Sequence, residues 1–316
     1  MKIQHLQGLI SAPFSPLDHQ GQVNLGLVPA YYNLLKQNGI TGAFINGSTG
    51  EGVSLTMDEK KQIAQAWADC SNHDPDFKVM AFLGGTCVAD CIELAKHAHK
   101  IGLYAISFTG PFYFKPANVK VLAKICIEIA GTVPDMPFYY YHIPVLTGVA
   151  FNMIDLVTEL DGKLPNFAGV KYTHEDFMDY QSCLNYSNGK YDMLWGRDEN
   201  MLSALVLGAK GAVGSTFNYA APLYSEMMDA YRSNHIDKAA ELQQKSIDMI
   251  RLLGKYGGIS VGKAYMKLVD MDCGEFRLPV SNMSAAQFES FKADVHQLGF
   301  DDFKSINADL VKNEAK

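Results

Sequence analysis

Eight short apolar segments recur through the first 220 residues and alternate with stretches of helical periodicity. Successive segments begin roughly 30 residues apart, which is the size of one strand–helix–strand unit. This alternation predicts a parallel sheet, because a parallel neighbour is usually reached by crossing over through a helix. The predicted strands are residues 8–14, 41–46, 78–83, 104–108, 137–141, 167–173, 191–195 and 211–215.

The number of units predicts how the sheet is completed. Eight units with short, apolar strands favour a closed (β/α)8 TIM barrel of the α/β class over residues 1–220. An open, doubly wound sheet is the alternative, but no Gly-x-Gly-x-x-Gly turn follows the first segment. Beyond the predicted barrel, residues 221–316 are predicted to form a C-terminal helical extension. Helical periodicity there covers residues 222–233, 236–253, 262–269 and 284–298.

Composition and charge narrow the classes of protein to which this chain can belong. The chain has 316 residues, 48% of them hydrophobic, which is enough to bury a large core. Its net charge of -7 argues against nucleic acid or an anionic membrane as a partner. No apolar run reaches the length of a membrane span, and the start lacks the apolar region of a signal peptide. Six cysteines without a CxxC pair favour reduced thiols, so we expect a cytoplasmic protein.

The sixth segment carries the residue that points most directly to chemistry. Lys171 follows four small or apolar residues, at the strand end where TIM barrels place their active sites. An ammonium on an apolar wall is poorly solvated, so its pKa should fall and the neutral amine should attack ketones. The alternative is a lysine that ends the strand and directs its charge into water.

Polar side chains gather at the other predicted strand ends as well. They supply hydroxyls and carboxylates around a single amine, an inventory that suits imine chemistry with proton transfer. No His-x-His pair or matching acid cluster accompanies them, so we expect no metal site. The candidate residues are Ser48, Thr49, Tyr141, Lys171, Thr173, Asp198, Glu199, Ser215 and Tyr113.

Several candidates also have a structural interpretation. Ser48 and Glu51 have the spacing of a capping box for the next helix, although a helix start with two hydroxyls would also seat a carboxylate. Tyr141 could relay a proton or fill the core. Asp198 and Glu199 could bind the hydroxyls of a polyol or favour the N-terminus of a helix electrostatically.

Two further patterns are assigned no catalytic role. Residues 257–263 approach a GxxxxGK phosphate loop, but Ala264 replaces the required hydroxyl residue and a helical segment comes first. His142 and His174 are single histidines at strand ends, so hydrogen bonding is a better interpretation than metal binding.

Taken in order, the strand ends resemble those of the pyruvate-dependent class I aldolases, the dihydrodipicolinate synthase/N-acetylneuraminate lyase family. The likeness extends over nearly the whole chain, and the motifs are most similar to the N-acetylneuraminate lyase branch. The motifs are Gly47-Ser48-Thr49-Gly50-Glu51, Tyr141-His142-Ile143-Pro144, Gly169-Val170-Lys171-Tyr172-Thr173, Gly196-Arg197-Asp198-Glu199 and Gly214-Ser215-Thr216-Phe217-Asn218.

The resemblance implies a cofactor-free lyase that cleaves N-acetylneuraminate, a sialic acid, reversibly to N-acetylmannosamine and pyruvate. Lys171 would form the imine with the keto carbon, and Tyr141 would pass protons beside the substrate carboxylate. Ser48 and Thr49 would hold that carboxylate, with Ser48 also counted as catalytic. The residues implied to bind the polyol tail are Thr173, Gly196, Asp198, Glu199 and Ser215.

The resemblance also implies a homotetramer, with Tyr113 near a subunit interface. Dihydrodipicolinate synthases carry an arginine just after the motif at strand five, where this chain has Val145-Leu146-Thr147-Gly148. Arg197 departs from the commoner non-basic residue and is expected to affect specificity for the tail. Two alternative functions remain. The chain could be another 2-keto-acid aldolase or dehydratase with the same barrel, or a non-catalytic ligand-binding barrel.

Overall fold

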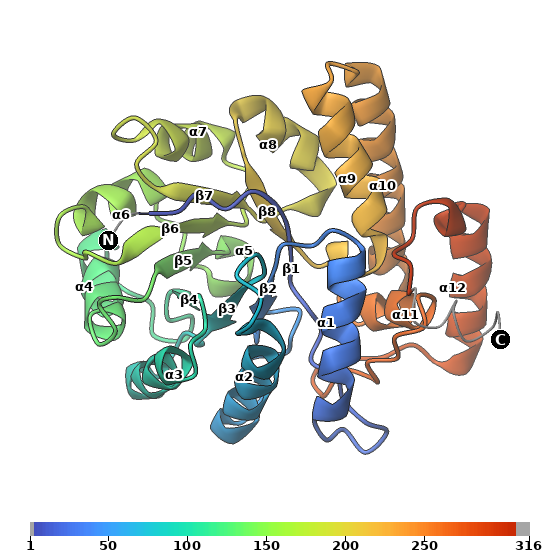
Figure 1. Ribbon diagram of the computed structural model, residues 1–316, viewed down its shortest axis with the longest axis horizontal. Helices are drawn as coiled ribbons and strands as arrows, with labels where there is room; N and C mark the ends of the chain where they lie inside the picture. The colour runs from blue at the N-terminus through green and yellow to red at the C-terminus, as the bar shows by residue number, and fades with distance from the viewer. Residues whose placement is uncertain (1–2, 308–316) are drawn as a thin grey trace.

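Eight parallel strands form a closed barrel at the centre of the protein (Figure 1). The computed structural model describes residues 3–307. Each strand pairs with the next in the sequence and the last pairs with the first, which confirms the predicted TIM barrel and excludes the open sheet. The strands are β1 Gly8–Ser11, β2 Gly42–Ile45, β3 Lys78–Phe82, β4 Ala105–Phe108, β5 Phe138–His142, β6 Phe167–Tyr172, β7 Asp192–Trp195 and β8 Gly211–Gly214.

Helices surround the barrel because its strands are apolar on both faces (Figure 1). In β5, Tyr139 and Tyr141 belong to the inner cluster, whereas Phe138 and Tyr140 pack outward against helices. The helices are α1 Val28–Gln37, α2 Met57–Ser71, α3 Val88–Lys100, α4 Val119–Ala130, α5 Pro144–Thr147, α6 Met153–Leu160, α7 Phe177–Asn185, α8 Met201–Leu207, α9 Phe217–Arg232, α10 Ile236–Tyr256, α11 Val261–Lys267 and α12 Ala285–Gln297, with 3-10 turns η1 Leu25–Leu27, η2 Asp198–Asn200 and η3 Phe300–Asp302.

The strand register places two of the predicted catalytic residues beside each other. Tyr141 of β5 pairs with Lys171 of β6, and Lys171 pairs in turn with Leu194 of β7. Because side chains alternate across a strand, the inward direction of Tyr139 is repeated at Tyr141. The closed register therefore brings the phenol and the amine to the same level, near the carboxyl ends of their strands.

The interpretation of Ser48 and Glu51 as a capping box is wrong. Helix α2 begins at Met57, and its capping box is formed by Thr56 and Glu59, whose side chains each accept the other residue's backbone N–H. Glu51 lies in a turn before the helix with a left-handed φ of 56°, and its carboxylate is bound elsewhere. The turn that carries Ser48 is therefore separate from the helix start.

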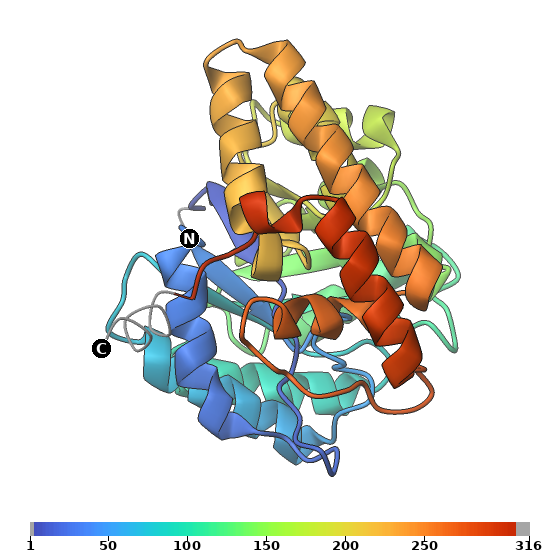
Figure 2. The ribbon, with the colours of Figure 1, turned by 90° about the vertical axis from the view of Figure 1, so that its right-hand side faces the viewer.

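Helices α10, α11 and α12 pack together beside the barrel, where Figure 2 shows them in orange and red. The last barrel helix, α9, packs against both β1 and α10. It crosses the boundary predicted at residue 220, where Ala220 has non-helical φ and ψ two positions before Pro222. The division of the chain at that point stays a prediction, and residues 308–316 of the predicted extension lie outside the described residues.

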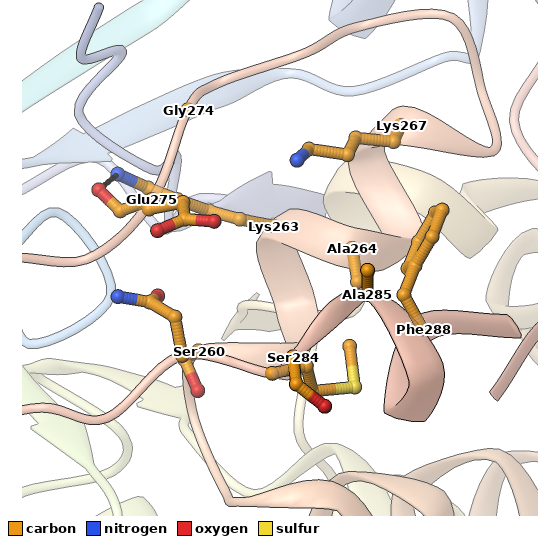
Figure 3. A pocket seen from close by; sticks show the side chains of 11 residues that line it. Ser260, Lys263, Ala264, Lys267, Gly274, Glu275, Ser284, Ala285 and Phe288 are labelled. Atoms are coloured by element: carbon orange, nitrogen blue, oxygen red, sulfur yellow. Dashed lines mark hydrogen bonds between the residues drawn. The ribbon is translucent and has the colours of Figure 1, made fainter. Parts of the chain in front are cut away.

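A buried ion pair joins the extension to the barrel. The Nζ of Lys263 on α11 lies 2.7 Å from Oε1 of Glu51, and both side chains are almost fully buried. Lys263 also donates to the carbonyl oxygen of Glu275, and Figure 3 shows this bond at the wall of a pocket beside α12. The second carboxylate oxygen of Glu51 accepts the backbone N–H of Arg277. These bonds tie the turn after β2 to α11 and to the segment before α12.

No helix in the described part of the chain is long and apolar enough to cross a bilayer. The six cysteines are all free thiols.

We predict that Lys263→Met destabilises the protein by about 3 kcal/mol, because it leaves the Glu51 carboxylate buried without its cation. Urea unfolding should also show that adding Glu51→Gln to this variant costs much less than Glu51→Gln alone. The control is Lys163→Met, which removes an exposed i,i+4 pair with Glu159 and should cost about 0.5 kcal/mol or less. Additive losses in the double variant would contradict a coupled pair.

Candidate active site

A cavity of about 520 Å³ opens at the carboxyl end of the barrel. It brings together every predicted site residue except Tyr113, whose side chain is 80% exposed and does not line it. The predicted residues that line the cavity are Ser48, Thr49, Tyr141, Lys171, Thr173, Gly196, Asp198, Glu199 and Ser215.

The amine of Lys171 is enclosed by aromatic rings. Its Nζ lies 3.8 Å from the ring centre of Phe44 and 4.1 Å from that of Tyr141, and the residue is 4% exposed. The amine itself makes no hydrogen bond or salt bridge to any residue between positions 3 and 307. Burial lowers the pKa of Lys171 to about 7, although the negative charge of Asp198 opposes the shift. The alternative of a lysine directed into water does not hold.

The phenol of Tyr141 is held in the same aromatic wall. Its ring packs edge-on against Phe44 and Phe82, with ring centres 5.4 Å and 5.7 Å apart. Burial raises the pKa of Tyr141, and the neighbouring hydroxyls of Ser48 and Thr173 oppose the shift. The phenol is therefore protonated at neutral pH and able to donate a hydrogen bond or a proton.

The turn after β2 presents two residues to the cavity. Asn46 has a left-handed φ of 58°, and a Cβ at Gly52 would lie 1.7 Å from the Asn46 carbonyl oxygen, so only glycine permits this fold of the chain. The backbone N–H groups of Ser48 and Thr49 donate to no residue that the structure describes. Two free N–H groups and two hydroxyls are a suitable seat for a carboxylate.

The opposite side of the cavity carries Asp198 from η2. Its Oδ2 accepts from the backbone N–H of Thr216 at 2.9 Å and from the Thr216 hydroxyl at 2.6 Å. Burial raises the pKa of Asp198 to about 6, and the Thr216 hydroxyl opposes the shift. A Cβ at Gly214 would lie 2.3 Å from Oδ1, so the carboxylate fits only because β8 ends in glycine.

Thr173 offers a hydroxyl to the same space. Its Oγ1 is buried and makes no hydrogen bond of good geometry within the described residues. A Cβ at Gly196 would lie 2.0 Å from this oxygen, so glycine at position 196 leaves room for it. A buried hydroxyl that makes no well-formed hydrogen bond to the protein can make one to a ligand.

Arg197, which was expected from the sequence to affect specificity for the tail, lines the cavity and forms ion pairs with Glu175 after β6 and with Glu199, the latter at 3.0 Å. Other residues at the cavity were missed by sequence reasoning. Ile250 and Leu253 of α10 also line the cavity. Nothing in the local sequence of α10 indicates this, because helical periodicity predicts which face is buried and not which cavity it covers.

The two histidines lie outside the cavity. The ring of His142 lies 5.0 Å from that of Tyr172 and 5.5 Å from that of His174. Burial lowers the pKa of His142 to about 3, so its imidazole is neutral. No group of three or more His, Cys, Asp or Glu side chains between residues 3 and 307 is placed to hold a metal ion.

Comparison with known proteins places the chain in a family. The sequence model of the Dihydrodipicolinate synthetase family matches residues 5–298. The chain belongs to this family. Among its relatives, the human N-acetylneuraminate lyase is 36% identical over 307 residues, which cover 95% of each chain.

Solved structures of the family agree with this relationship. The N-acetylneuraminate lyase of Proteus mirabilis has a TM-score of 0.90 at 35% identity, covering 94% of this chain and 100% of its own. That of Aliivibrio salmonicida has a TM-score of 0.91 at 35% identity, covering 94% and 98%. This member of the dihydrodipicolinate synthetase family thus has the family's barrel and helical C-terminus.

We predict that the rate of pyruvate imine formation rises with pH, with its midpoint near the Lys171 pKa of about 7. The sign follows because only the neutral amine attacks the ketone, and deprotonation increases as pH passes the pKa. Single-turnover borohydride trapping between pH 5.5 and 9.5 measures the rate. A midpoint near 10, the ordinary range of an exposed lysine, would contradict the effect of burial.

Proposed function

We propose that this chain is a Schiff-base aldolase that cleaves N-acetylneuraminate reversibly to N-acetylmannosamine and pyruvate. The observation that carries the proposal is the amine of Lys171, which is buried against Phe44 and the phenol of Tyr141. A lysine with a low pKa beside a protonated phenol has the chemistry needed to form and break an imine. The lyase relatives, which match along most of their length, support the same reaction.

The reaction begins when Lys171 Nζ attacks the keto carbon of the open-chain sugar acid. A carbon–nitrogen bond forms, and the carbonyl oxygen leaves as water after it takes the phenol proton of Tyr141, which leaves a protonated imine and a phenolate. The phenolate then takes the proton of the hydroxyl on the fourth carbon, the bond between the third and fourth carbons breaks, and its electron pair moves toward the protonated imine. An aldehyde and an enamine result. Protonation of the enamine and hydrolysis release pyruvate and restore the amine.

The protein groups around Lys171 are assigned by where they lie. The Tyr141 phenol lies against the amine, so it is our candidate for moving the proton on the cleaved hydroxyl. Ser48 and Thr49 are proposed to hold the carboxylate of the pyruvate portion through hydroxyls and free N–H groups. We also count Ser48 as a catalytic residue because its hydroxyl lies beside the phenol.

The far side of the cavity favours a hydroxyl-rich tail. Asp198 and Glu199 are acceptors that suit sugar hydroxyls, and they would repel a second carboxylate. Leu146 lies at the cavity wall in the segment where dihydrodipicolinate synthases carry an arginine. Thr173, Gly196 and Ser215 complete the surface that we assign to the tail.

We infer that the protein assembles as a homotetramer, in keeping with its family. Two exposed aromatic side chains in contact with each other follow β4 in the chain, Tyr113 at 80% and Phe114 at 85% exposure. Val145 and Leu146 in α5 are also exposed. Exposed apolar side chains of this kind are typical of a protein interface, so Tyr113 is proposed to lie at a subunit contact.

A cytoplasmic location of the protein also stays a proposal.

Two other functions make different predictions. A different 2-keto-acid aldolase or dehydratase would act on a 2-keto-3-deoxy sugar acid and not on sialic acids. A non-catalytic barrel would bind pyruvate saturably without turnover. A coupled assay for pyruvate release over several sialic acids and 2-keto-3-deoxy sugar acids separates these possibilities.

We predict that Lys171→Ala abolishes cleavage of N-acetylneuraminate while the protein stays folded, because the covalent path is lost with the nucleophile. In the wild type, pyruvate with borohydride should add one adduct per chain, and peptide mass spectrometry should find it on Lys171. Circular dichroism and thermal unfolding serve as the folding control. A fully unmodified Lys171 peptide, or an adduct on another lysine, would be incompatible with the proposed nucleophile.

A further inference from the structure

A chain of buried hydroxyls runs from outside the barrel to the carboxylate of Asp198. The Oγ of Ser246 on α10 lies 2.7 Å from the phenol oxygen of Tyr224 on α9. That phenol oxygen lies 2.7 Å from Oγ1 of Thr216, which lies 2.6 Å from Oδ2 of Asp198. The three hydroxyl residues are at most 1% exposed, and of these Thr216 borders the cavity.

The direction of these hydrogen bonds is fixed by chemistry. An ionised carboxylate only accepts, so the single hydroxyl proton of Thr216 points at Asp198. Tyr224 must then donate to Thr216. The Ser246 hydroxyl accordingly donates to Tyr224 at 2.7 Å, in preference to the Asp198 carbonyl oxygen that lies 3.4 Å from its Oγ. Each donor strengthens the next hydrogen bond because it polarises the hydroxyl that it contacts.

Helix α10 also holds the backbone of Asp198. The amide nitrogen of Gln243 donates to the Asp198 carbonyl oxygen at 3.2 Å, and its Oε1 accepts the backbone N–H of Leu202 at 2.8 Å. Thus one helix outside the barrel fixes both the main chain and, through Tyr224, the side chain of the same residue.

The two carboxylate oxygens of Asp198 consequently differ. Oδ2 accepts two hydrogen bonds from Thr216, whereas Oδ1 accepts none from the described residues. Because Asp198 lines the cavity, Oδ1 is the oxygen left for a ligand. If Thr216 lost its donor from Tyr224, its hydroxyl could rotate away, and Oδ2 would then be held by the backbone N–H of Thr216 alone.

We propose that Tyr224 and Ser246 are positioning residues that orient Asp198 so that Oδ1 accepts a hydroxyl of the sugar tail. This inference rests on the proposed function, in which the tail lies against Asp198. It predicts an effect on recognition of the tail and none on the pyruvate portion, since pyruvate has no hydroxyl for Asp198 to bind.

The test compares Tyr224→Phe with Tyr265→Phe. Tyr265 is a matched control because it is equally buried and also loses one hydrogen bond to α10, at the carbonyl oxygen of Met249. For Tyr224→Phe, the KM for N-acetylneuraminate should rise about 5- to 20-fold, as expected for weakening a hydrogen bond to a charged group. For the same variant, the pyruvate concentration that gives half-maximal trapping by borohydride should stay unchanged. Tyr265→Phe should change neither quantity.

A second pair of variants, both at Thr216, separates the effect of losing the hydroxyl from the effect of changed packing. Thr216→Val keeps the side-chain size but removes the donor, so it should raise the KM at least as much as Tyr224→Phe. Thr216→Ser keeps the donor and should restore most of the affinity. Ser246→Ala, at the far end of the chain, should have a smaller effect in the same direction.

The outcomes distinguish this inference from the proposed function. An active wild type whose KM is unchanged by Tyr224→Phe would overturn the positioning role alone. Equal weakening of pyruvate and sialic acid by Tyr224→Phe would also overturn it, because a general loosening of the barrel would then explain the loss. A wild type that traps pyruvate but cleaves no sialic acid would instead contradict the proposed function and, with it, the contact between Asp198 and the sugar.

Discussion

The burial of one amine against aromatic rings is the constraint on which the candidate site depends. Lys171 is surrounded by Phe44 and Tyr141, and burial outweighs the attraction of Asp198 in setting its pKa near 7. The ring faces can favour an ammonium, but they cannot replace the water that burial removes. The barrel makes this possible because β2, β5 and β6 each contribute one inward side chain at the same level. The closed barrel keeps those strands in register and thereby keeps the amine buried.

The helices beyond the barrel maintain the geometry of both sides of the cavity. Lys263 of α11 holds the turn that carries Ser48 and Thr49 through its ion pair with Glu51. On the opposite side, α10 reaches Asp198 through Gln243 and through the hydroxyls that end at Thr216. The extension is thus connected to the proposed carboxylate seat and to the proposed sugar contact by separate sets of buried polar bonds, which makes it part of the site as well as part of the fold.

Much of the barrel could be predicted because its signal is local. Apolar runs that end in polar residues gave the eight strands and located Lys171, Tyr141 and Asp198 at their ends. The interpretation of Ser48 and Glu51 as the start of a helix was wrong, because a turn with a left-handed residue at Glu51 has the same sequence spacing as a capping box. The partner of Glu51 lies 212 residues away in a segment that resembled a failed phosphate loop, and no periodicity connects such positions. The roles of the site residues remain predictions, since they depend on a substrate that the fold alone does not specify.

Direct titration of the Lys171 amine tests the central claim most directly. Protein labelled with ¹³C at the lysine ε-carbons, with the Lys171 signal assigned by its absence in Lys171→Arg, can be followed by NMR between pH 5 and 11. The burial of the amine predicts a chemical-shift transition near pH 7, well separated from the transitions of exposed lysines. A Lys171 signal that titrates above pH 10 with the others would show that the amine is charged at neutral pH, and the account of a buried, neutral nucleophile would then be wrong.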